Sequence, residues 1–301
     1  MKKLLITGAW SHTAQQQESL KQLGYDICFV QNEKDELPLE AYAAEVIICN
    51  GLFLHHDINK FTNLKYIQLT SAGFDRVPMD IVKQRNIQIF NARGVYSIPM
   101  AEYALCGVLD LYKKSRFFYD NQKQNKWIKN REVFEIFGKN VLIVGSGNVG
   151  TECARHFSAF GARVRGIDLF PRTDPNYEEI VHLSELANEL KDADIIVLTL
   201  PLTDETKHLF NKNTFDHIKD GAVLVNIARG AVIDTAALID SLNSHKLSGA
   251  VLDVFEEEPL DESSPLWNME NVIITPHNSF VGDGNAIRLF EIIKNNLENL
   301  T

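Results

Sequence analysis

Residues 141–150 have the sequence VLIVGSGNVG. Four apolar residues lead directly into Gly145, Gly147 and Gly150, and the following segment, Thr151–Gly161, has apolar residues near helical spacing. We therefore expect a buried strand, a tight glycine turn and a helix, in that order. This is the context in which the pattern G-x-G-x-x-G binds a dinucleotide.

The three glycines have separate expected roles. Gly145 permits the turn, Gly147 lets the backbone approach a pyrophosphate, and Gly150 lets the helix pack closely against the strand. The pyrophosphate is expected at the helix N-terminus, where unpaired N–H groups and the helix dipole favour an anion. The alternative is a glycine-rich turn that binds no ligand.

An acidic residue lies at the distance that the dinucleotide interpretation requires. Asp168 follows the expected strand Arg163–Ile167 and lies 18 residues after Gly150, close to the spacing of the motif. A carboxylate at this position accepts hydrogen bonds from the ribose hydroxyls of an adenosine and repels a 2′-phosphate, so the sequence favours NAD over NADP. Arg172 lies four residues further on and can moderate that repulsion, so the expected preference is not absolute.

The overall composition is that of a globular protein. The chain has 301 residues, of which 45% are hydrophobic and 23% are charged, enough for about two domains with full cores. Its formal net charge of −10 repels nucleic acid and anionic membranes, so neither is expected as the main partner.

The cysteines and the N-terminus indicate a cytoplasmic protein. The four cysteines form no C-x-x-C pair and are expected to be buried free thiols in a reducing compartment, with no metal site. The start, MKKLLITGAW, has too short an apolar core for a signal peptide, and no apolar run approaches the length of a membrane span. These cysteines are Cys28, Cys49, Cys106 and Cys153.

Strands and helices alternate along the whole chain, which predicts an α/β fold of two doubly wound parallel-sheet domains. The first half is expected to be flavodoxin-like. Its expected strands are Lys3–Thr7, Tyr25–Val30, Val46–Cys49, Leu64–Leu69 and Ile87–Phe90. The second half is expected to be a Rossmann domain that binds NAD. Its six expected strands are Val141–Val144, Arg163–Ile167, Ile195–Leu198, Val223–Asn226, Gly249–Leu252 and Val272–Thr275.

Two long helical patterns flank the second half. Residues 98–119 are expected to form one long helix, and Phe290–Leu300 a closing amphipathic helix. The segment Lys113–Arg131 is locally basic and contains several aromatic residues. We interpret it as a solvated connecting arm, with a nucleic-acid patch as the less favoured alternative.

Three chemically useful side chains follow neighbouring strands of the second half. Ligands of open α/β sheets bind beyond the carboxyl ends of the strands, where Arg229, Glu258 and His277 are expected. An arginine fork suits the carboxylate and ketone oxygen of a 2-keto acid, and a histidine can protonate that oxygen as hydride arrives at the carbon. A neighbouring carboxylate favours the imidazolium form. Glu256 and Glu257 compete with Glu258 for this role.

Five motifs occur in an order that resembles the D-isomer-specific 2-hydroxyacid dehydrogenase family, which includes D-lactate, D-glycerate and D-3-phosphoglycerate dehydrogenases. They are SAGFD, GSGNVG, PLTDET, NIARG with DVFEEEP, and TPH, between Ser71 and His277. The resemblance implies that the chain transfers a hydride between NAD(H) and a small D-2-hydroxy acid or 2-keto acid. It also implies a substrate (catalytic) domain of residues 1–96 and 280–301, a dinucleotide-binding domain of residues 97–279, and a homodimer formed through the cofactor domain.

The resemblance assigns roles to individual residues. Arg229 binds and polarises the substrate, His277 is the acid/base, and Glu258 is its partner. Asp253 meets the nicotinamide carboxamide. The substrate carboxylate is held by backbone N–H groups of Ser71, Ala72 and Gly73. The complete set of residues expected to contact the cofactor is Gly145, Gly147, Asn148, Val149, Gly150, Asp168, Leu200, Pro201, Thr206, Ile227, Ala228 and Asp253.

The chain departs from the family pattern in places. Asn148 and Val149 stand where Arg-Ile is frequent, but both positions act mainly through the backbone. Asn278-Ser279-Phe280 replaces a glycine-rich run, and the loop Asn50–Phe53 lacks an arginine, which counts against 3-phosphoglycerate. The alternatives are an NADH-sensing, corepressor-like binding protein without significant turnover, and a formate dehydrogenase, which usually has glutamine after the histidine.

Overall fold

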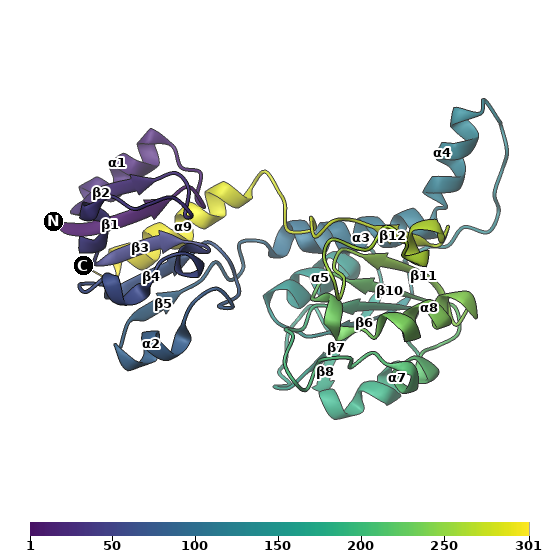
Figure 1. The fold of residues 1–301 in the computed structure, drawn as a ribbon. Helices are drawn as coiled ribbons and strands as arrows, with labels where there is room; N and C mark the ends of the chain where they lie inside the picture. Colours follow the sequence, from purple (N-terminus) through teal and green to yellow (C-terminus); the bar gives the residue numbers. More distant parts are fainter. Residues whose placement is uncertain (301) are drawn as a thin grey trace. The chain divides into compact units, whose positions relative to one another are not determined.

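The computed structural model describes residues 1–300, which divide into two units. The first contains Met1–Tyr96 and the segment from Gly282 onward, and the second contains Ser97–Val281. Each unit is built on its own parallel sheet with helices packed against it (Figure 1). The predicted fold class is therefore confirmed.

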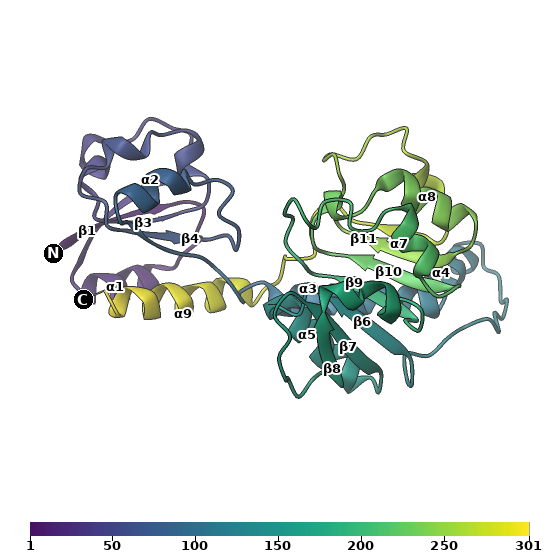
Figure 2. The same cartoon turned by 90° about the horizontal axis from the view of Figure 1, so that it is seen from below.

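The sheet of the first unit has five parallel strands in the order β2-β1-β3-β4-β5, the flavodoxin-like order. The strands are β1 (Lys2–Thr7), β2 (Tyr25–Val30), β3 (Val46–Cys49), β4 (Tyr66–Leu69) and β5 (Gln88–Phe90). Figure 2 shows α1 (Ala14–Gln22) and α9 (Asn285–Glu298) on one side of this sheet and α2 (Met79–Gln84) on the other.

The C-terminal segment completes the first unit. Leu289, Ile293 and Leu297 of α9 pack into the core beside the strands β1 and β3. The Tyr25 hydroxyl donates to the Leu297 carbonyl at 3.0 Å, and Asn296 Nδ2 donates to Gln68 Oε1 at 2.7 Å. The helix begins at Asn285, earlier than the expected Phe290, because Leu289 already belongs to its buried face.

The sheet of the second unit has seven parallel strands in the order β12-β11-β10-β9-β6-β7-β8. They are β6 (Asn140–Val144), β7 (Arg163–Asp168), β8 (Glu179–His182), β9 (Ile195–Leu198), β10 (Ala222–Asn226), β11 (Leu247–Leu252) and β12 (Val272–Ile274). The expected number of six was wrong because β8 is an edge strand in which only Ile180 is buried, so its apolar pattern is weak.

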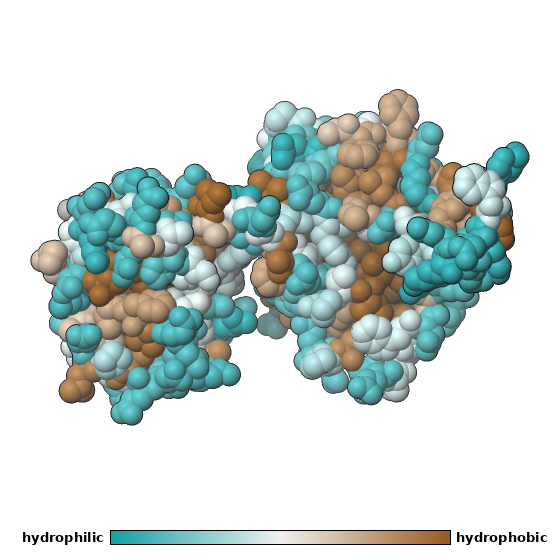
Figure 3. Space-filling view, turned by 90° about the horizontal axis from the view of Figure 1, so that it is seen from above, coloured by the Kyte–Doolittle hydropathy of each residue, from teal (hydrophilic) through white to brown (hydrophobic). Residues whose placement is uncertain are grey.

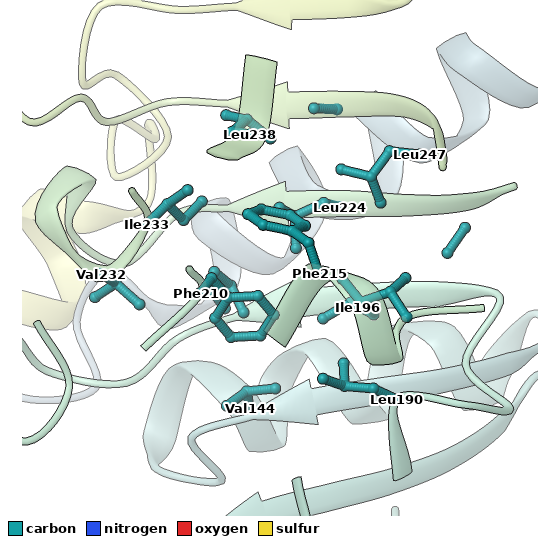
Figure 4. Close-up of a cluster of buried hydrophobic side chains, with 14 of the residues drawn as sticks. Val144, Leu190, Ile196, Phe210, Phe215, Leu224, Val232, Ile233, Leu238 and Leu247 are labelled. Carbon is teal, nitrogen blue, oxygen red and sulfur yellow. The ribbon is translucent and has the colours of Figure 1, made fainter. Parts of the chain in front are cut away.

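Helices cover both faces of this sheet. One core lies between the sheet and the helices α6 (Leu186–Glu189), α7 (Lys212–His217) and α8 (Thr235–Asn243). In it the rings of Phe210 and Phe215 pack among aliphatic side chains of the strands (Figure 4). The other core contains α3 (Ser97–Tyr112) and α5 (Asn148–Ala159). Strand residues alternate between the two cores, as the pleat of a strand requires.

The predicted single helix over residues 98–119 is wrong. α3 ends at Tyr112, Lys114 has a left-handed φ of 54°, and a second helix, α4 (Ser115–Lys123), follows. None of the residues of α4 is buried, so no packing holds it in line with α3. Figure 1 shows α4 and the loop after it projecting from the second unit, and Figure 3 shows many hydrophilic residues at that end.

The expectation of four buried cysteines is wrong for two of them. Cys49 and Cys153 are buried, but Cys28 is half-buried and Cys106 is exposed. Cys106 lies on the same outward stripe of α3 as Glu102 and Asp110, opposite the residues that pack on the sheet. Within residues 1–300, no helix combines the length and the apolar character needed to cross a membrane.

Candidate active site

The glycine turn joins β6 to α5, and two of its glycines are required by close contacts. Gly145 has a φ of 99°, and a Cβ added there would lie 2.7 Å from the Leu200 Cα. A Cβ on Gly150 would lie 2.1 Å from the Gly145 carbonyl oxygen. At Gly147, by contrast, a Cβ would meet no atom within 4 Å. The space beside Gly147 is therefore open to a ligand.

The N-terminus of α5 faces this open space without a side-chain cap. The helix starts at Asn148 rather than at the expected Thr151, and its N-cap residue, Gly147, supplies no side-chain hydrogen bond. Val149 and Gly150 thus belong to its first turn. Uncapped N–H groups at a helix N-terminus attract an anion such as a pyrophosphate. The residues present therefore fit a dinucleotide.

Asp168 lies at the carboxyl end of β7, beside the glycine turn. Its Oδ2 accepts from the Ser146 N–H at 2.9 Å and its Oδ1 accepts from the Phe170 N–H at 3.0 Å. Each carboxylate oxygen keeps further acceptor capacity, so the group can still receive hydroxyl donors. Arg172 donates to the Thr151 hydroxyl at 2.9 Å and lies 3.6 Å from Asp174. Its ion pair is therefore with Asp174 and not with Asp168.

The loop after β9 lies under the glycine turn. Leu200 is buried and supports Gly145, while Pro201 is exposed. The buried Thr206 hydroxyl donates to the Pro201 carbonyl and accepts from the Thr203 N–H, both at 2.7 Å. These bonds hold the shape of the loop. Two further residues of the expected cofactor set, Ile227 and Ala228, have buried side chains at the end of β10.

Arg229 follows β10 at the same edge of the sheet. Its neighbour Gly230 packs so tightly on the next loop that an added Cβ would lie 1.8 Å from the Phe255 backbone carbon. The Arg229 side chain is exposed, and one guanidinium nitrogen donates to the Ala228 carbonyl at 2.7 Å. No acidic side chain of residues 1–300 pairs with it, so its charge remains available to an anionic ligand.

His277 follows β12 and pairs with Glu258, which follows β11. His277 Nδ1 lies 2.9 Å from Glu258 Oε2, and Glu258 Oε1 accepts from the Phe255 N–H at 3.1 Å. The backbone of His277 is left-handed, with a φ of 53°, and its N–H donates to the Asp253 carbonyl at 2.8 Å. Nδ1 is thereby engaged, and Nε2 has no partner within the described chain.

The other two glutamates of the DVFEEEP motif have different surroundings. Glu256 accepts from the Thr235 N–H at 3.0 Å and lies 2.5 Å from His208 Nε2. Burial by itself would raise the pKa of Glu256, but the hydrogen bonds from Thr235 and His208 hold it below its ordinary value of 4.5. Glu257 has no hydrogen bond to any described residue. Glu258 is therefore the glutamate that contacts His277.

Asp253, which follows β11, is buried and fully hydrogen-bonded, which its place in the sequence did not indicate. Its carboxylate is fully buried and accepts from the Thr275 hydroxyl at 2.5 Å, the Asn278 N–H at 2.7 Å and the Ser279 N–H at 3.0 Å. It thus holds the segment that carries His277. Thr275 is not among the site residues expected from the sequence, although its place directly before Pro276 and His277 in the TPH motif was a signal.

In the first unit, Ser71, Ala72 and Gly73 form the loop after β4. The Ser71 hydroxyl donates to the Gly73 carbonyl at 3.1 Å, and Asn91 Nδ2 donates to the Ala72 carbonyl at 2.7 Å. The N–H groups of these three loop residues donate to no acceptor within residues 1–300. They are therefore available to an anion. No group of three or more His, Cys, Asp or Glu side chains in the described chain is arranged to hold a metal ion.

Comparisons with known proteins identify the family. Residues 105–279 match the model of the D-isomer specific 2-hydroxyacid dehydrogenase, NAD binding domain. A D-lactate dehydrogenase of Staphylococcus aureus is 33% identical over 243 residues, which cover 76% of this chain and 73% of that protein.

Two solved structures are similar along nearly the whole chain. A D-isomer specific 2-hydroxyacid dehydrogenase family protein from Aeromonas salmonicida is 33% identical, with a TM-score of 0.83 over 98% of this chain and 94% of that one. D-lactate dehydrogenase from Aquifex aeolicus, complexed with NAD and lactic acid, is 28% identical, with a TM-score of 0.78 over 99% and 95%. The chain therefore belongs to the D-isomer specific 2-hydroxyacid dehydrogenase family, and residues 105–279 are its NAD binding domain.

Proposed function

We propose that this protein is an NAD-dependent dehydrogenase that interconverts a small D-2-hydroxy acid and its 2-keto acid. The observation that carries the proposal is the His277–Glu258 pair, at 2.9 Å, with Nε2 of His277 unpaired within the described chain. Arg229 stands at the end of a neighbouring strand with no acidic partner in that chain. Relatives named D-lactate dehydrogenase support a small 2-keto acid as the substrate.

Each residue then has a definite task in the reduction. Bound NADH supplies the hydride for the carbonyl carbon. The guanidinium of Arg229 binds the carbonyl oxygen and stabilises the negative charge that grows there. His277 Nε2 donates the proton that this oxygen takes up. Glu258 accepts from Nδ1, which orients the ring and leaves Nε2 directed to the substrate oxygen.

The cofactor is proposed to bind at the glycine turn. Its pyrophosphate would meet the uncapped N–H groups of α5 beside Gly147, and Asp168 would accept from the adenosine ribose hydroxyls. Asn148 and Val149 would contribute through their backbone. We retain Ser71, Ala72 and Gly73 as the proposed donors to the substrate carboxylate, because their N–H groups have no acceptor within residues 1–300.

The test is an assay of NADH oxidation with a panel of small 2-keto acids, among them glyoxylate, pyruvate and hydroxypyruvate. Turnover of at least one is expected, with the D-enantiomer of the product oxidised in the reverse direction. NADH binding without turnover of any member would refute the proposal and favour the NADH-sensing alternative.

Replacing Asp168 by asparagine tests the proposed cofactor preference. The substitution keeps the shape but removes the charge that would repel a 2′-phosphate, and it weakens the bonds to the ribose. Hydrogen bonds to a charged group contribute about 1.5–3 kcal/mol. The ratio of kcat/KM for NADPH to that for NADH should therefore rise about 10–100-fold. D192N is the matched control, since Asp192 is an exposed aspartate that precedes β9 and so lies at the opposite edge of the sheet from Asp168. An unchanged ratio in D168N would contradict the assignment.

We also propose a homodimer formed through the second unit. The arm after α4 exposes large apolar side chains, among them Trp127 at 95% and Phe137 at 76% exposure. Exposed apolar groups of this size are typical of interaction surfaces. Sedimentation of the purified protein should give a dimer, and a monomer at micromolar concentration would contradict this.

A further inference from the structure

A chain of hydrogen bonds connects α3 to the segment that carries His277. The Tyr103 hydroxyl lies 2.5 Å from the Thr275 hydroxyl, which donates to Asp253 Oδ1 at 2.5 Å. The Asp253 carboxylate in turn accepts from the N–H groups of Asn278 and Ser279. All these groups belong to the second unit.

The bond from Thr275 to Asp253 determines which hydroxyl donates in the bond between Tyr103 and Thr275. A threonine hydroxyl has one hydrogen, and Thr275 donates it to the Asp253 carboxylate. Tyr103 must therefore be the donor to Thr275. Burial raises the pKa of the Tyr103 hydroxyl, which keeps it protonated and able to donate. The result is a directional chain of donors that ends on a buried carboxylate, where each bond polarises the next.

Close packing of α3 on the sheet explains why Tyr103 reaches this site. A Cβ on Gly107 would lie 2.5 Å from Val251 Cγ1 in β11, so only glycine allows this approach. One turn further along the helix, the Leu111 side chain packs against β11 at Gly249, where an added Cβ would lie 3.1 Å from Leu111 Cδ1. Tyr103 lies one turn before Gly107 on the same face of the helix, and the strand continues from Val251 towards Asp253.

Asp253 holds the backbone on both sides of His277. Its carbonyl oxygen accepts from the His277 N–H, and its carboxylate accepts from Asn278 and Ser279. His277 is in the left-handed region, which is costly for a residue with a side chain and needs such support. We propose that Tyr103 is a positioning residue for His277, acting through Thr275 and Asp253. This inference rests on the proposed function for its effect on catalysis, but not for the hydrogen bonds themselves.

The test compares two tyrosine-to-phenylalanine substitutions on the same helix. Y103F removes the first donor of the chain, and Y112F removes a hydroxyl that has no hydrogen bond within residues 1–300. We expect kcat to fall about tenfold in Y103F with KM for NADH unchanged, and kcat in Y112F to equal that of the wild type. Equal kcat in Y103F and the wild type would overturn the proposal.

Substitutions of Thr275 distinguish positioning from general destabilisation. T275V removes the hydroxyl and should lower kcat at least as much as Y103F, while T275S keeps the hydroxyl and should restore most of it. The double variant Y103F/T275V should be no worse than T275V alone, because both act through one chain of bonds. Full additivity of the two effects would overturn the proposal.

Amide hydrogen exchange provides a readout that does not depend on turnover. Peptides spanning residues 276–281 should exchange about tenfold faster in Y103F than in the wild type or Y112F, because the Asp253 carboxylate that accepts from the Asn278 and Ser279 N–H groups is held less firmly. If the wild type turns over no 2-keto acid, the proposed function fails, and this measurement alone decides the inference. Unchanged exchange in Y103F would overturn it.

Discussion

H277Q is expected to lower kcat for the reduction of a 2-keto acid by about 10²–10⁴-fold, the contribution usual for a general acid. Glutamine has a similar size and can still donate to Glu258, so the segment after β12 should keep its conformation. It cannot supply a proton near neutral pH. Because His277 lies on the loop beyond β12 and not in the glycine turn, affinity for NADH should stay close to that of the wild type.

The second unit offers a matched control for this substitution. His208 also pairs with a glutamate, with Nε2 2.5 Å from Glu256 Oε1, but it has no proposed part in the reaction. H208Q should therefore retain activity near that of the wild type. Steady-state kinetics with NADH fluorescence titration would measure both variants. If H277Q kept kcat within threefold of the wild type, His277 would not be the acid.

R229A is expected to lower kcat/KM for the 2-keto acid by about 10³-fold. The guanidinium is a positive group at this edge of the sheet without an acidic partner in the described chain, and loss of one such stabilising donor costs about 10²–10³ in kcat. Weaker substrate binding adds to this loss in kcat/KM. R229K should recover only part of the activity, because lysine provides a point charge instead of a fork that makes two parallel hydrogen bonds.

Activity, cofactor affinity and folding must be measured together for Arg229. Its side chain is exposed and makes one hydrogen bond, to the Ala228 carbonyl, so R229A should keep the circular dichroism spectrum and Tm of the wild type. R163A, at an exposed arginine that begins β7, is the control and should retain full activity. A loss of NADH binding as large as the loss of kcat/KM would argue that Arg229 serves the cofactor instead.

Local patterns predicted most of the fold. The strands Tyr25–Val30, Val46–Cys49 and Ile195–Leu198 have the predicted bounds, because each is a mostly apolar run between turn residues. The failures occur where burial is slight. β8 buries one residue, so it leaves no clear apolar pattern. α4 buries none, but its aromatic residues continue the helical signal of α3, so the break at Lys114 was not visible.

For the proposed site, the sequence placed Arg229, Glu258 and His277 beyond neighbouring strands. It left three consecutive glutamates as partners for the histidine. Glu256 was excluded by contacts with Thr235 and His208, which are distant in the chain and whose approach depends on how α8 and the loop before α7 pack. A pattern along the chain contains no information about such contacts.

The sequence by itself determined the glycine turn, the alternation of strands and helices, and the order of the residues at the carboxyl edge of the sheet. These depend on periodicity and on residues near one another in the chain. Only the tertiary structure decided that Glu258 contacts His277, that Asp253 is buried under the segment after it, and that Tyr103 reaches Thr275. These contacts join residues from 19 to 172 positions apart, so they depend on the packing of whole elements.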